Sequence, residues 1–330
     1  MTRPDLSIII VSTNEASWLE RCLPTVFAHA GDIALDVIVV DNDSTDGTAM
    51  LVDGFDGARV VWCENHGFGH ANNRGIMNSE ARYILLLNPD TEIVEGTFAE
   101  LVAAMDARPT VGLAGVKQLD GEGVLFPTIR RRPHMLRMLA EALGSERLPI
   151  HSRWLGEREL NIEAYEQEVD CDWTSGSFML IRREALLAGG LLDERSFIYS
   201  EEPDLCGRIS DHGWAIRHFP FMTIVHHAGK AGIKPRILAQ DVYSRLLYAR
   251  KHMSLFHRSI YRGAIALRYL LRLLAGAFRR DGRLSREANL AGLRVVFGLA
   301  GSPYEAPPAT GLRPLDRRSV AAEWRPRASA

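Results

Sequence analysis

Short apolar runs alternate with helical patterns along the first quarter of the chain. Residues 6–12 form a continuous apolar run with many β-branched residues, which is typical of a buried parallel strand. Similar strands are predicted at residues 35–40, 58–62 and 83–87. Helices are predicted between them, at residues 15–28, up to about residue 55, and at residues 70–79. This alternation predicts an α/β fold with a parallel, Rossmann-like sheet flanked by helices.

The pattern is less regular after residue 116. Residues 117–170 are predicted to be an insertion over the site, and residues 171–182 a strand that follows a tight turn. A helix is expected to start at Asp204, and residues 215–226 are expected to form two short strands. Beyond Lys234 the pattern is helical.

These patterns predict three parts. An α/β domain covers residues 1–232, with a regular half at about 1–116 and a less regular half at about 117–232, which the resemblance described below identifies as the donor and acceptor halves of a catalytic domain. A basic helical extension covers residues 233–301, and a poorly ordered tail covers residues 302–330.

Polar loops follow four successive strands of the predicted sheet. Ligands of parallel sheets bind at the carboxyl ends of the strands, so four such loops indicate one binding site. The loops are Ser12-Thr13-Asn14, Asp41 to Gly47, Asn65 to Asn73, and Asn88-Pro89-Asp90. The sequence lacks the Gly-x-Gly-x-x-Gly and Gly-Lys-Ser/Thr fingerprints there, which argues against a dehydrogenase or a P-loop enzyme.

Three carboxylates lie within four residues at Glu201, Glu202 and Asp204. Placing them together costs repulsion and desolvation unless a cation or a proton transfer uses them. The alternative is a solvated helix N-terminus, where acids interact well with the helix dipole. The histidine pair His226-His227 follows in the sequence and, together with Asp90, favours a functional site.

Composition limits the class of protein. The 330 residues are 46% hydrophobic and 24% charged, as in ordinary globular proteins. The four cysteines show no paired spacing, which argues against a zinc cage or a disulfide framework and fits a reducing compartment. No signal peptide is evident at the first residues, so a cytoplasmic location is expected.

The net charge of −2 hides an asymmetry between the two ends of the chain. From Lys230 onward there are 20 basic and 6 acidic residues, whereas the preceding part holds 19 basic and 35 acidic residues. An acidic body suits a cation, and a basic end suits phosphate or an anionic surface.

Basic residues between positions 251 and 279 are predicted to share about a third of a helix circumference. They are Lys251, Arg258, Arg262, Arg268, Arg272 and Arg279. The apolar runs between them are too short to span a membrane. Two interpretations stay open: an interfacial helix on the cytoplasmic face of an anionic membrane, or a helix packed on the catalytic body.

The order of the motifs resembles family 2 glycosyltransferases, and most closely a rhamnosyltransferase-like branch. The donor half is similar in residues 7–14, 40–47, 65–75 and 87–91, and the acceptor half in residues 173–180 and 201–208. Each motif alone is weak, but six in order make the resemblance strong, and it covers residues 6–232. It implies a GT-A fold and inverting transfer from a nucleotide sugar.

The resemblance also implies residue roles. Asp41 would bind the nucleobase; Ser12, Thr13 and Asn14 would line the nucleotide pocket; Asn65, Gly67 and Asn73 would shape the donor loop. Asn88 and Asp90 take the place of the D-x-D metal motif, and His226 takes that of a late metal-proximal histidine, with His227 as the fallback. Glu202 takes the place of the catalytic acid. Our hypothesis for Glu201 is that it orients Glu202 or binds acceptor hydroxyls. Trp173, Ser175, Gly176 and Asp204 belong to the acceptor half. Turn roles for Asp41 and Asp90 and a core role for His226 are the alternatives.

The chemistry of such a transfer fits these residue types. A divalent cation, Mg²⁺ or Mn²⁺, offsets the charge of a departing diphosphate, and oxygen ligands suit both ions. A base activates the acceptor hydroxyl, and the neighbouring Glu201 should raise the pKa of Glu202.

The expected partners are a dTDP- or UDP-sugar, carrying rhamnose or another hexose, and a glycan or polyprenyl-diphosphate-linked acceptor. No nucleic acid is expected. A non-catalytic sugar-nucleotide-binding scaffold and a metal-dependent nucleotidyltransferase are the alternatives. The acid cluster argues against a scaffold. A nucleotidyltransferase usually has a basic Gly-rich loop, which the first strand lacks.

Overall fold

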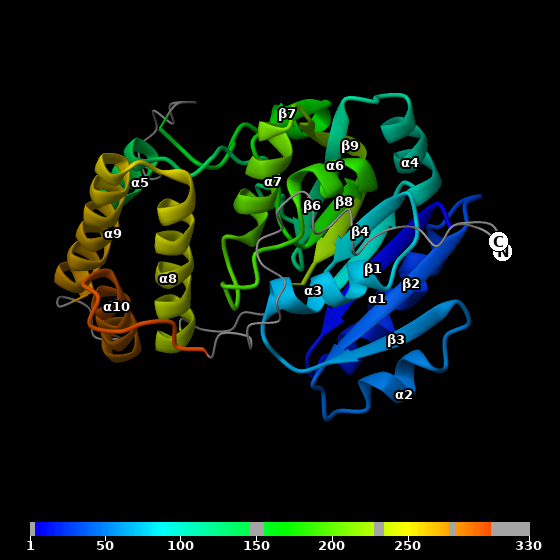
Figure 1. The fold of residues 1–330 in the computed structure, drawn as a ribbon, viewed down its shortest axis with the longest axis horizontal. Coiled ribbons are helices and arrows are strands. Elements are labelled where there is room, and N and C mark those ends of the chain that lie inside the picture. The colour runs from blue at the N-terminus through cyan, green and yellow to red at the C-terminus, as the bar shows by residue number, and fades with distance from the viewer. Residues whose placement is uncertain (1–3, 146–154, 228–233, 277–281, 305–330) are drawn as a thin grey trace.

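The central feature of the fold is a nine-stranded mixed sheet with strand order β3-β2-β1-β4-β8-β6-β9-β5, onto which β7 adds at β9 (Figure 1). The computed structural model describes residues 4–145, 155–227, 234–276 and 282–304. The strands are β1 (Leu6–Ser12), β2 (Leu35–Asn42), β3 (Ala58–Cys63), β4 (Tyr83–Leu87), β5 (Thr91–Glu95), β6 (Val111–Asp120), β7 (Val169–Cys171), β8 (Phe178–Arg182) and β9 (Ala215–His226).

The first four strands are parallel, as the sequence predicts, and the sheet becomes mixed beyond them. β1 pairs with β2 and β4, and β2 pairs with β3, all in parallel. β8 then runs antiparallel to both β4 and β6, and β6 and β9 are parallel. The fold is therefore an α/β fold of the GT-A type.

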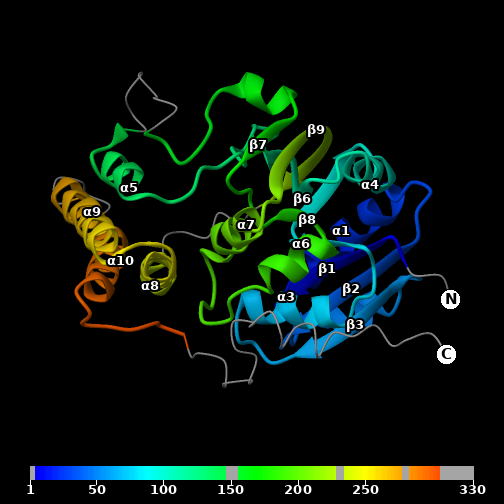
Figure 2. The same cartoon turned by 45° about the horizontal axis from the view of Figure 1, so that its top comes forward.

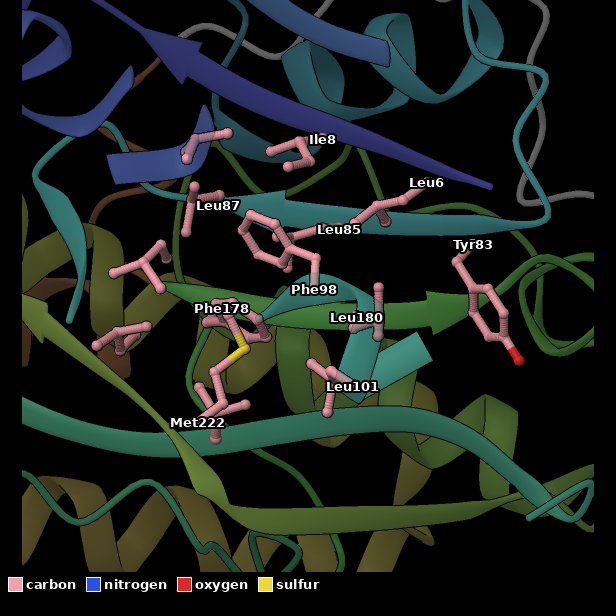
Figure 3. Close-up of a cluster of buried hydrophobic side chains, with 14 of the residues drawn as sticks. Leu6, Ile8, Tyr83, Leu85, Leu87, Phe98, Leu101, Phe178, Leu180 and Met222 are labelled. Atoms are coloured by element: carbon pink, nitrogen blue, oxygen red, sulfur yellow. The ribbon is translucent and has the colours of Figure 1, made fainter. Parts of the chain in front are cut away.

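Helices cover both faces of the sheet, because alternate residues of each buried strand point to opposite faces. Leu6 and Ile8 pack with Phe98 and Leu101 on one face, as Figure 3 shows. Ile9 belongs to a separate core on the other face. The helices are α1 (Ala16–Ala28), α2 (Thr48–Val52), α3 (Phe68–Met77), α4 (Phe98–Asp106), α5 (Met135–Ala142), α6 (Arg183–Gly189), α7 (Glu201–Asp211), α8 (Pro235–His252), α9 (Leu255–Gly276) and α10 (Gly282–Val296).

Two sequence predictions about local structure are wrong. Helix α7 begins at Glu201 rather than Asp204, so all three acids lie in its first turn, where the positive end of the helix dipole stabilises them. Residues 215–226 form one strand, β9, rather than two. The register of β9 against β6 shifts between Phe219 and Thr223. Pro220 lies in this irregular part, where its missing N–H costs no ladder hydrogen bond.

The C-terminal helices form a separate layer with a core of their own. Met138 of α5, Val242 of α8, Ile265 of α9 and Val296 of α10 are buried together. Figures 1 and 2 show these helices grouped beside α7, at the end of the molecule away from β3. Among the helices that the structure describes, none is long and apolar enough to cross a bilayer.

The predicted basic stripe is wrong in one member, whereas Arg258, Arg262, Arg268 and Arg272 do share one helix, α9. Lys251 lies on α8 and not on α9, and its ammonium group pairs with Asp193 and Asp204. Arg268 pairs with Glu141 of α5. Arg279 and most of the predicted tail, residues 305–330, lie outside the described residues.

Candidate active site

The predicted nucleotide loops lie side by side at the carboxyl ends of β1 and β2. Ser12 and Asp41 are partners in the parallel register. Asn42 donates from Nδ2 to Thr13 Oγ1 over 3.0 Å, and Asn14 Oδ1 accepts from the backbone N–H of Thr45 over 2.7 Å. The two loops therefore hold each other in place.

Asp41 combines burial with a turn contact. Its side chain is 6% exposed, and Oδ1 accepts the backbone N–H of Ser44 over 2.8 Å. Within the described part of the chain, Oδ2 makes no hydrogen bond. A turn role and nucleobase binding are compatible, because Oδ1 accepts the hydrogen bond of the turn and Oδ2 is left for a nucleobase. Binding of a nucleobase stays a prediction.

The donor loop is fixed against the segment that precedes α7. Gly67 has φ +101°, and a Cβ there would lie 2.2 Å from the carbonyl oxygen of Phe197, so only glycine fits. Asn65 Oδ1 accepts the N–H of Gly67 over 3.3 Å. Asn73 is buried, and its amide bonds both the backbone of Leu192 and the carboxylate of Glu194. These residues shape the loop; contact with a donor stays a prediction.

Asp90 and His226 meet at the end of β4 and β9. Asp90 Oδ1 lies 3.0 Å from His226 Nε2, and Asn88 Nδ2 lies 3.2 Å from the same nitrogen. The structure therefore brings Asn88 and Asp90 together with His226, which lies 138 positions after Asn88 in the sequence. The ring of His227 stacks on Trp18 at 5.2 Å and bonds Glu92 instead.

A polar chain leads from His226 toward the acceptor half. Gln118 Nε2 lies 3.0 Å from His226 Nδ1, and Gln118 Oε1 accepts from Ser177 Oγ over 2.7 Å. Ser177 Oγ in turn lies 3.1 Å from Ser175 Oγ. The sequence analysis missed Gln118, because nothing in its local pattern marks it.

Glu15 was also missed. It precedes α1 at the end of the first polar loop, and burial, followed by repulsion from Asp90, raises its pKa to about 7. Because its pKa is raised in part by Asp90, the charge of Glu15 depends on what binds beside Asp90. The sequence could have indicated this residue, because an acid follows Asn14 directly at the end of a strand.

The acid pair follows a strained turn. Tyr199 and Ser200 both have left-handed backbone angles, with φ +77° and +70°. Such conformations cost about 1–3 kcal/mol each for residues other than glycine and are concentrated at functional sites. Helix α8 holds this turn, because Ser244 Oγ donates to the carbonyl of Ile198 over 2.8 Å. The extension thus supports the start of α7.

Glu202 and Glu201 occupy different environments. Glu202 lines a cavity of about 160 Å³, together with Trp173, Ser175 and Arg130. Burial raises the pKa of Glu202, whereas its own backbone N–H, Arg130 and the N–H of Gly176 lower it. The sequence analysis expected repulsion from Glu201 to raise the pKa of Glu202, whereas in the structure burial is the main cause.

Glu201 is 2% exposed, and among the described residues its Oε1 has no hydrogen-bond partner. Burial, followed by the charge of Glu202, raises its pKa well above the usual value. Burial thus favours the neutral form of Glu201. Glu202, which lines the cavity together with Arg130, is the better placed of the two to act as a base.

Gly176 is packed against the carboxylate of Glu202. A Cβ at position 176 would lie 2.5 Å from Glu202 Oε1. We expect Gly176→Ala to displace that carboxylate and to lower sugar transfer about 100-fold, because a 1 Å misplacement of a reacting group can cost that much. Thermal melting should change little. Gly263→Ala, where nothing lies within 4 Å of the new methyl group, is the matched control. Full turnover by Gly176→Ala would contradict the placement.

Asp204 faces away from this cavity and joins α7 to α8. Its carboxylate bonds Arg208, Lys251 and His252, with 2.6 Å to His252 Nε2. These partners, acting against burial, lower the pKa of Asp204. The predicted acceptor contact stays a prediction, and the visible role is to hold α8 in place.

Replacement of Asp204 by Asn should destabilise the fold by about 3–5 kcal/mol, because it leaves buried cations without their counter-charge. Urea unfolding at pH 7 measures this, with the exposed Asp211→Asn as control. Since the folded pKa of Asp204 is lowered, its contribution is complete above about pH 4 and is lost as the pH falls below that. An unchanged midpoint would contradict the role.

A family model and two named relatives each match this chain over more than half of its length. The model of "Glycosyl transferase family 2" matches residues 7–187, more than half of the chain. The N-acetylglucosaminyl-diphospho-decaprenol L-rhamnosyltransferase of Mycobacterium tuberculosis is 29% identical over 84% of this chain and 95% of its own length. Rhamnosyltransferase WbbL of Escherichia coli is 24% identical over 67% of this chain and 83% of its own length.

A solved structure shows the same fold. GalNAc-T7, in a structure with UDP, GalNAc and Mn²⁺, has a TM-score of 0.55 and 14% identity, and the match covers 89% of this chain and 54% of that one. The family assignment favours glycosyl transfer over the nucleotidyltransferase and scaffold alternatives. The chain belongs to glycosyl transferase family 2 and is a glycosyltransferase, which transfers a sugar from a sugar donor to an acceptor.

Proposed function

We propose that this enzyme transfers rhamnose, or another hexose, from a dTDP- or UDP-sugar to a hydroxyl of a polyprenyl-diphosphate-linked glycan, with inversion. The observation that carries the proposal is the cavity in which Glu202 lies beside Trp173 and Ser175. Rhamnose and the lipid-linked acceptor are supported by the name of the Mycobacterium tuberculosis relative.

The proposed chemistry uses residues of both halves. Glu202 takes the proton from the acceptor hydroxyl, and Glu201, held neutral, keeps a second negative charge away from that proton. Trp173 offers an aromatic face for the acceptor sugar. In the sequence motifs, no second carboxylate is placed to attack the donor sugar covalently. This fits a single displacement and therefore inversion.

A divalent cation fits beside Asp90. The donor set there is one carboxylate and one imidazole, 3.0 Å apart, and within the described ranges no group of three or more His, Cys, Asp or Glu residues gathers. Asp90 and His226 would hold the ion, and oxygens of the donor would complete its shell. When bound, the cation would neutralise charge on the leaving diphosphate. One imidazole favours Mn²⁺ over Mg²⁺ modestly.

We further propose that residues 1–232 form the catalytic unit and that the extension, residues 233–301, touches the cytoplasmic face of a membrane. Leu255, Phe256, Leu271 and Leu274 of α9 are exposed. Exposed apolar side chains with arginines on the same helix suit an anionic interface. The protein should float with anionic vesicles at low salt and not with neutral ones; failure to float with either would contradict this contact.

The experiment that tests the function offers dTDP-rhamnose and UDP-hexoses with Mn²⁺ and a short polyprenyl-diphosphate-linked N-acetylglucosamine. The expected result is free nucleoside diphosphate together with a glycosylated lipid. Pyrophosphate release would indicate nucleotidyl transfer, and nucleotide binding without product would indicate a scaffold; either would overturn the proposal. Proton NMR of the product gives the anomeric configuration and checks inversion.

A further inference from the structure

Arg130 is a buried arginine that forms no ion pair with any of the residues that the structure describes. The residue is 8% exposed. Its Nε donates to the carbonyl of Pro127 over 2.9 Å. In the part of the chain that the structure describes, its terminal nitrogens make no hydrogen bond. The carboxylates of Glu157 and Glu202, which line the same cavity, attract Arg130 without forming an ion pair with it. Burial lowers its pKa, so the charge is held at a cost.

Two arginines that are less buried than Arg130 are neutralised by carboxylates. Arg208 pairs with Asp204, and Arg245 pairs with Asp241 four residues earlier in α8. Burying a guanidinium is unfavourable unless a partner compensates for the lost water. Arg130 therefore differs from these two, and the difference indicates a partner that is not part of the protein.

The position of Arg130 shows where that partner would lie. The guanidinium lies over the ring of Trp173 at 5.2 Å and over that of Phe126 at 5.7 Å. All three residues line the same cavity as Glu202. Helices α8 and α9 close the cavity with Tyr248 and Tyr261. Two aromatic rings thus fix the guanidinium in the wall of the proposed acceptor site.

We propose that Arg130 binds a phosphate of the acceptor's diphosphate, so that one sugar spans the distance between this anion and the base Glu202. This rests on the proposed function. A planar guanidinium suits phosphate, which it contacts with two parallel hydrogen bonds. The donor's diphosphate is assigned to Asp90, which does not line this cavity. A neutral glycan would leave Arg130 without an ion pair among the described residues, so the site favours acceptors that carry phosphate next to the sugar.

Geranyl diphosphate is the probe for this site, with geraniol and inorganic pyrophosphate for comparison. Calorimetry is done on the full chain with saturating dTDP and Mn²⁺, which block the donor site. Wild-type protein should bind geranyl diphosphate. Arg130→Met keeps the apolar stem on Trp173 but removes the charge, and should weaken binding about 10- to 100-fold, the usual effect of a hydrogen bond to a charged group. Arg130→Lys should lose less.

Arg59→Met is the matched control, because Arg59 is an exposed arginine paired with Asp36 at the opposite end of the sheet. It should bind geranyl diphosphate as the wild type does, and all variants should melt within a few degrees of it. Equal affinity of Arg130→Met and wild type, or no binding by wild type, would overturn the proposal. Tighter binding of geranyl diphosphate than of pyrophosphate would identify the bound phosphate as part of a lipid-linked acceptor. Tighter binding of pyrophosphate would overturn the proposal.

This binding experiment needs no turnover and therefore separates the two proposals. Binding that depends on Arg130 in a protein that transfers no sugar would refute the proposed function and leave the anion site standing. Transfer to a diphosphate-linked acceptor with an unchanged KM in Arg130→Met would refute the anion site alone. If both hold, Arg130→Met should raise the KM for the diphosphate-linked acceptor and spare transfer to a neutral alkyl N-acetylglucosaminide.

Discussion

Glu202→Gln should lower sugar transfer by about 10²–10⁴-fold, the range that a positioned general base contributes. The amide keeps the size and the contact with Gly176 but cannot accept a proton from the acceptor hydroxyl. Affinity for the nucleotide sugar should not change, because the base lies in the acceptor cavity. Initial rates at saturating donor, together with donor titrations, measure the two effects separately.

The pH profile gives a second readout for the same variant. Since burial raises the pKa of Glu202, the protonated and inactive form persists above the usual range of a glutamate, and kcat/KM of the wild type should rise with pH across that raised pKa. The residual activity of Glu202→Gln should lack this rise.

Two further variants complete the experiment. Glu201→Gln replaces a neutral carboxyl by a neutral amide and should lose far less activity than Glu202→Gln. Glu184→Gln, at an exposed position in the first turn of α6, should retain full activity. Turnover of Glu202→Gln within about tenfold of the wild type would show that another group takes the proton.

Local patterns were enough to predict the first half of the fold. The apolar runs at β1, β2 and β4 are continuous because both faces of these strands are buried, whereas β3 lies at the edge of the sheet and is partly exposed. The polar loops after these strands mark the carboxyl edge. The pattern could not predict that β8 runs antiparallel between β4 and β6. Strand direction depends on how the chain returns to the sheet, and this is not encoded within the strand.

The candidate site was predictable where one short segment carries the chemistry. Asp90 and Glu202 lie in recognisable motifs, and the structure places them in regions joined through His226, Gln118, Ser177 and Ser175. Contacts over long sequence separation were missed. His252 meets Asp204 across 48 positions, and Arg130 lines the cavity of Glu202 from a segment that read only as a basic cluster.

The start of α7 shows how two interpretations of one motif can both hold. The acids are in the first turn, as a solvated helix N-terminus would have them, yet Glu201 and Asp204 are buried. One acid anchors α8, one lines the cavity, and one has a carboxylate oxygen, Glu201 Oε1, without a hydrogen-bond partner among the described residues. Local sequence could not separate these roles, because helices α8 and α9 create the difference from outside the motif.

Asp90→Asn should weaken Mn²⁺ binding and lower sugar transfer. The loss should exceed about 10–100-fold, because losing a residue that only supports a metal ligand already costs that much. Asparagine keeps the size of Asp90 and can still bond His226 Nε2, so the fold around β4 and β9 should be unchanged. What it removes is the carboxylate charge of Asp90 at the proposed cation site.

Manganese binding can be measured without turnover, by electron paramagnetic resonance in the presence of dTDP. Wild-type protein should bind Mn²⁺ more tightly with dTDP than without it, because diphosphate oxygens are proposed to supply part of the shell. Asp90→Asn should lose most of this binding. The neighbouring Glu92→Gln removes an equal charge from the pair with His227 and should bind Mn²⁺ as the wild type does. If Asp90→Asn bound Mn²⁺ normally, Asp90 would be a turn residue after Pro89 and the cation would have to lie elsewhere.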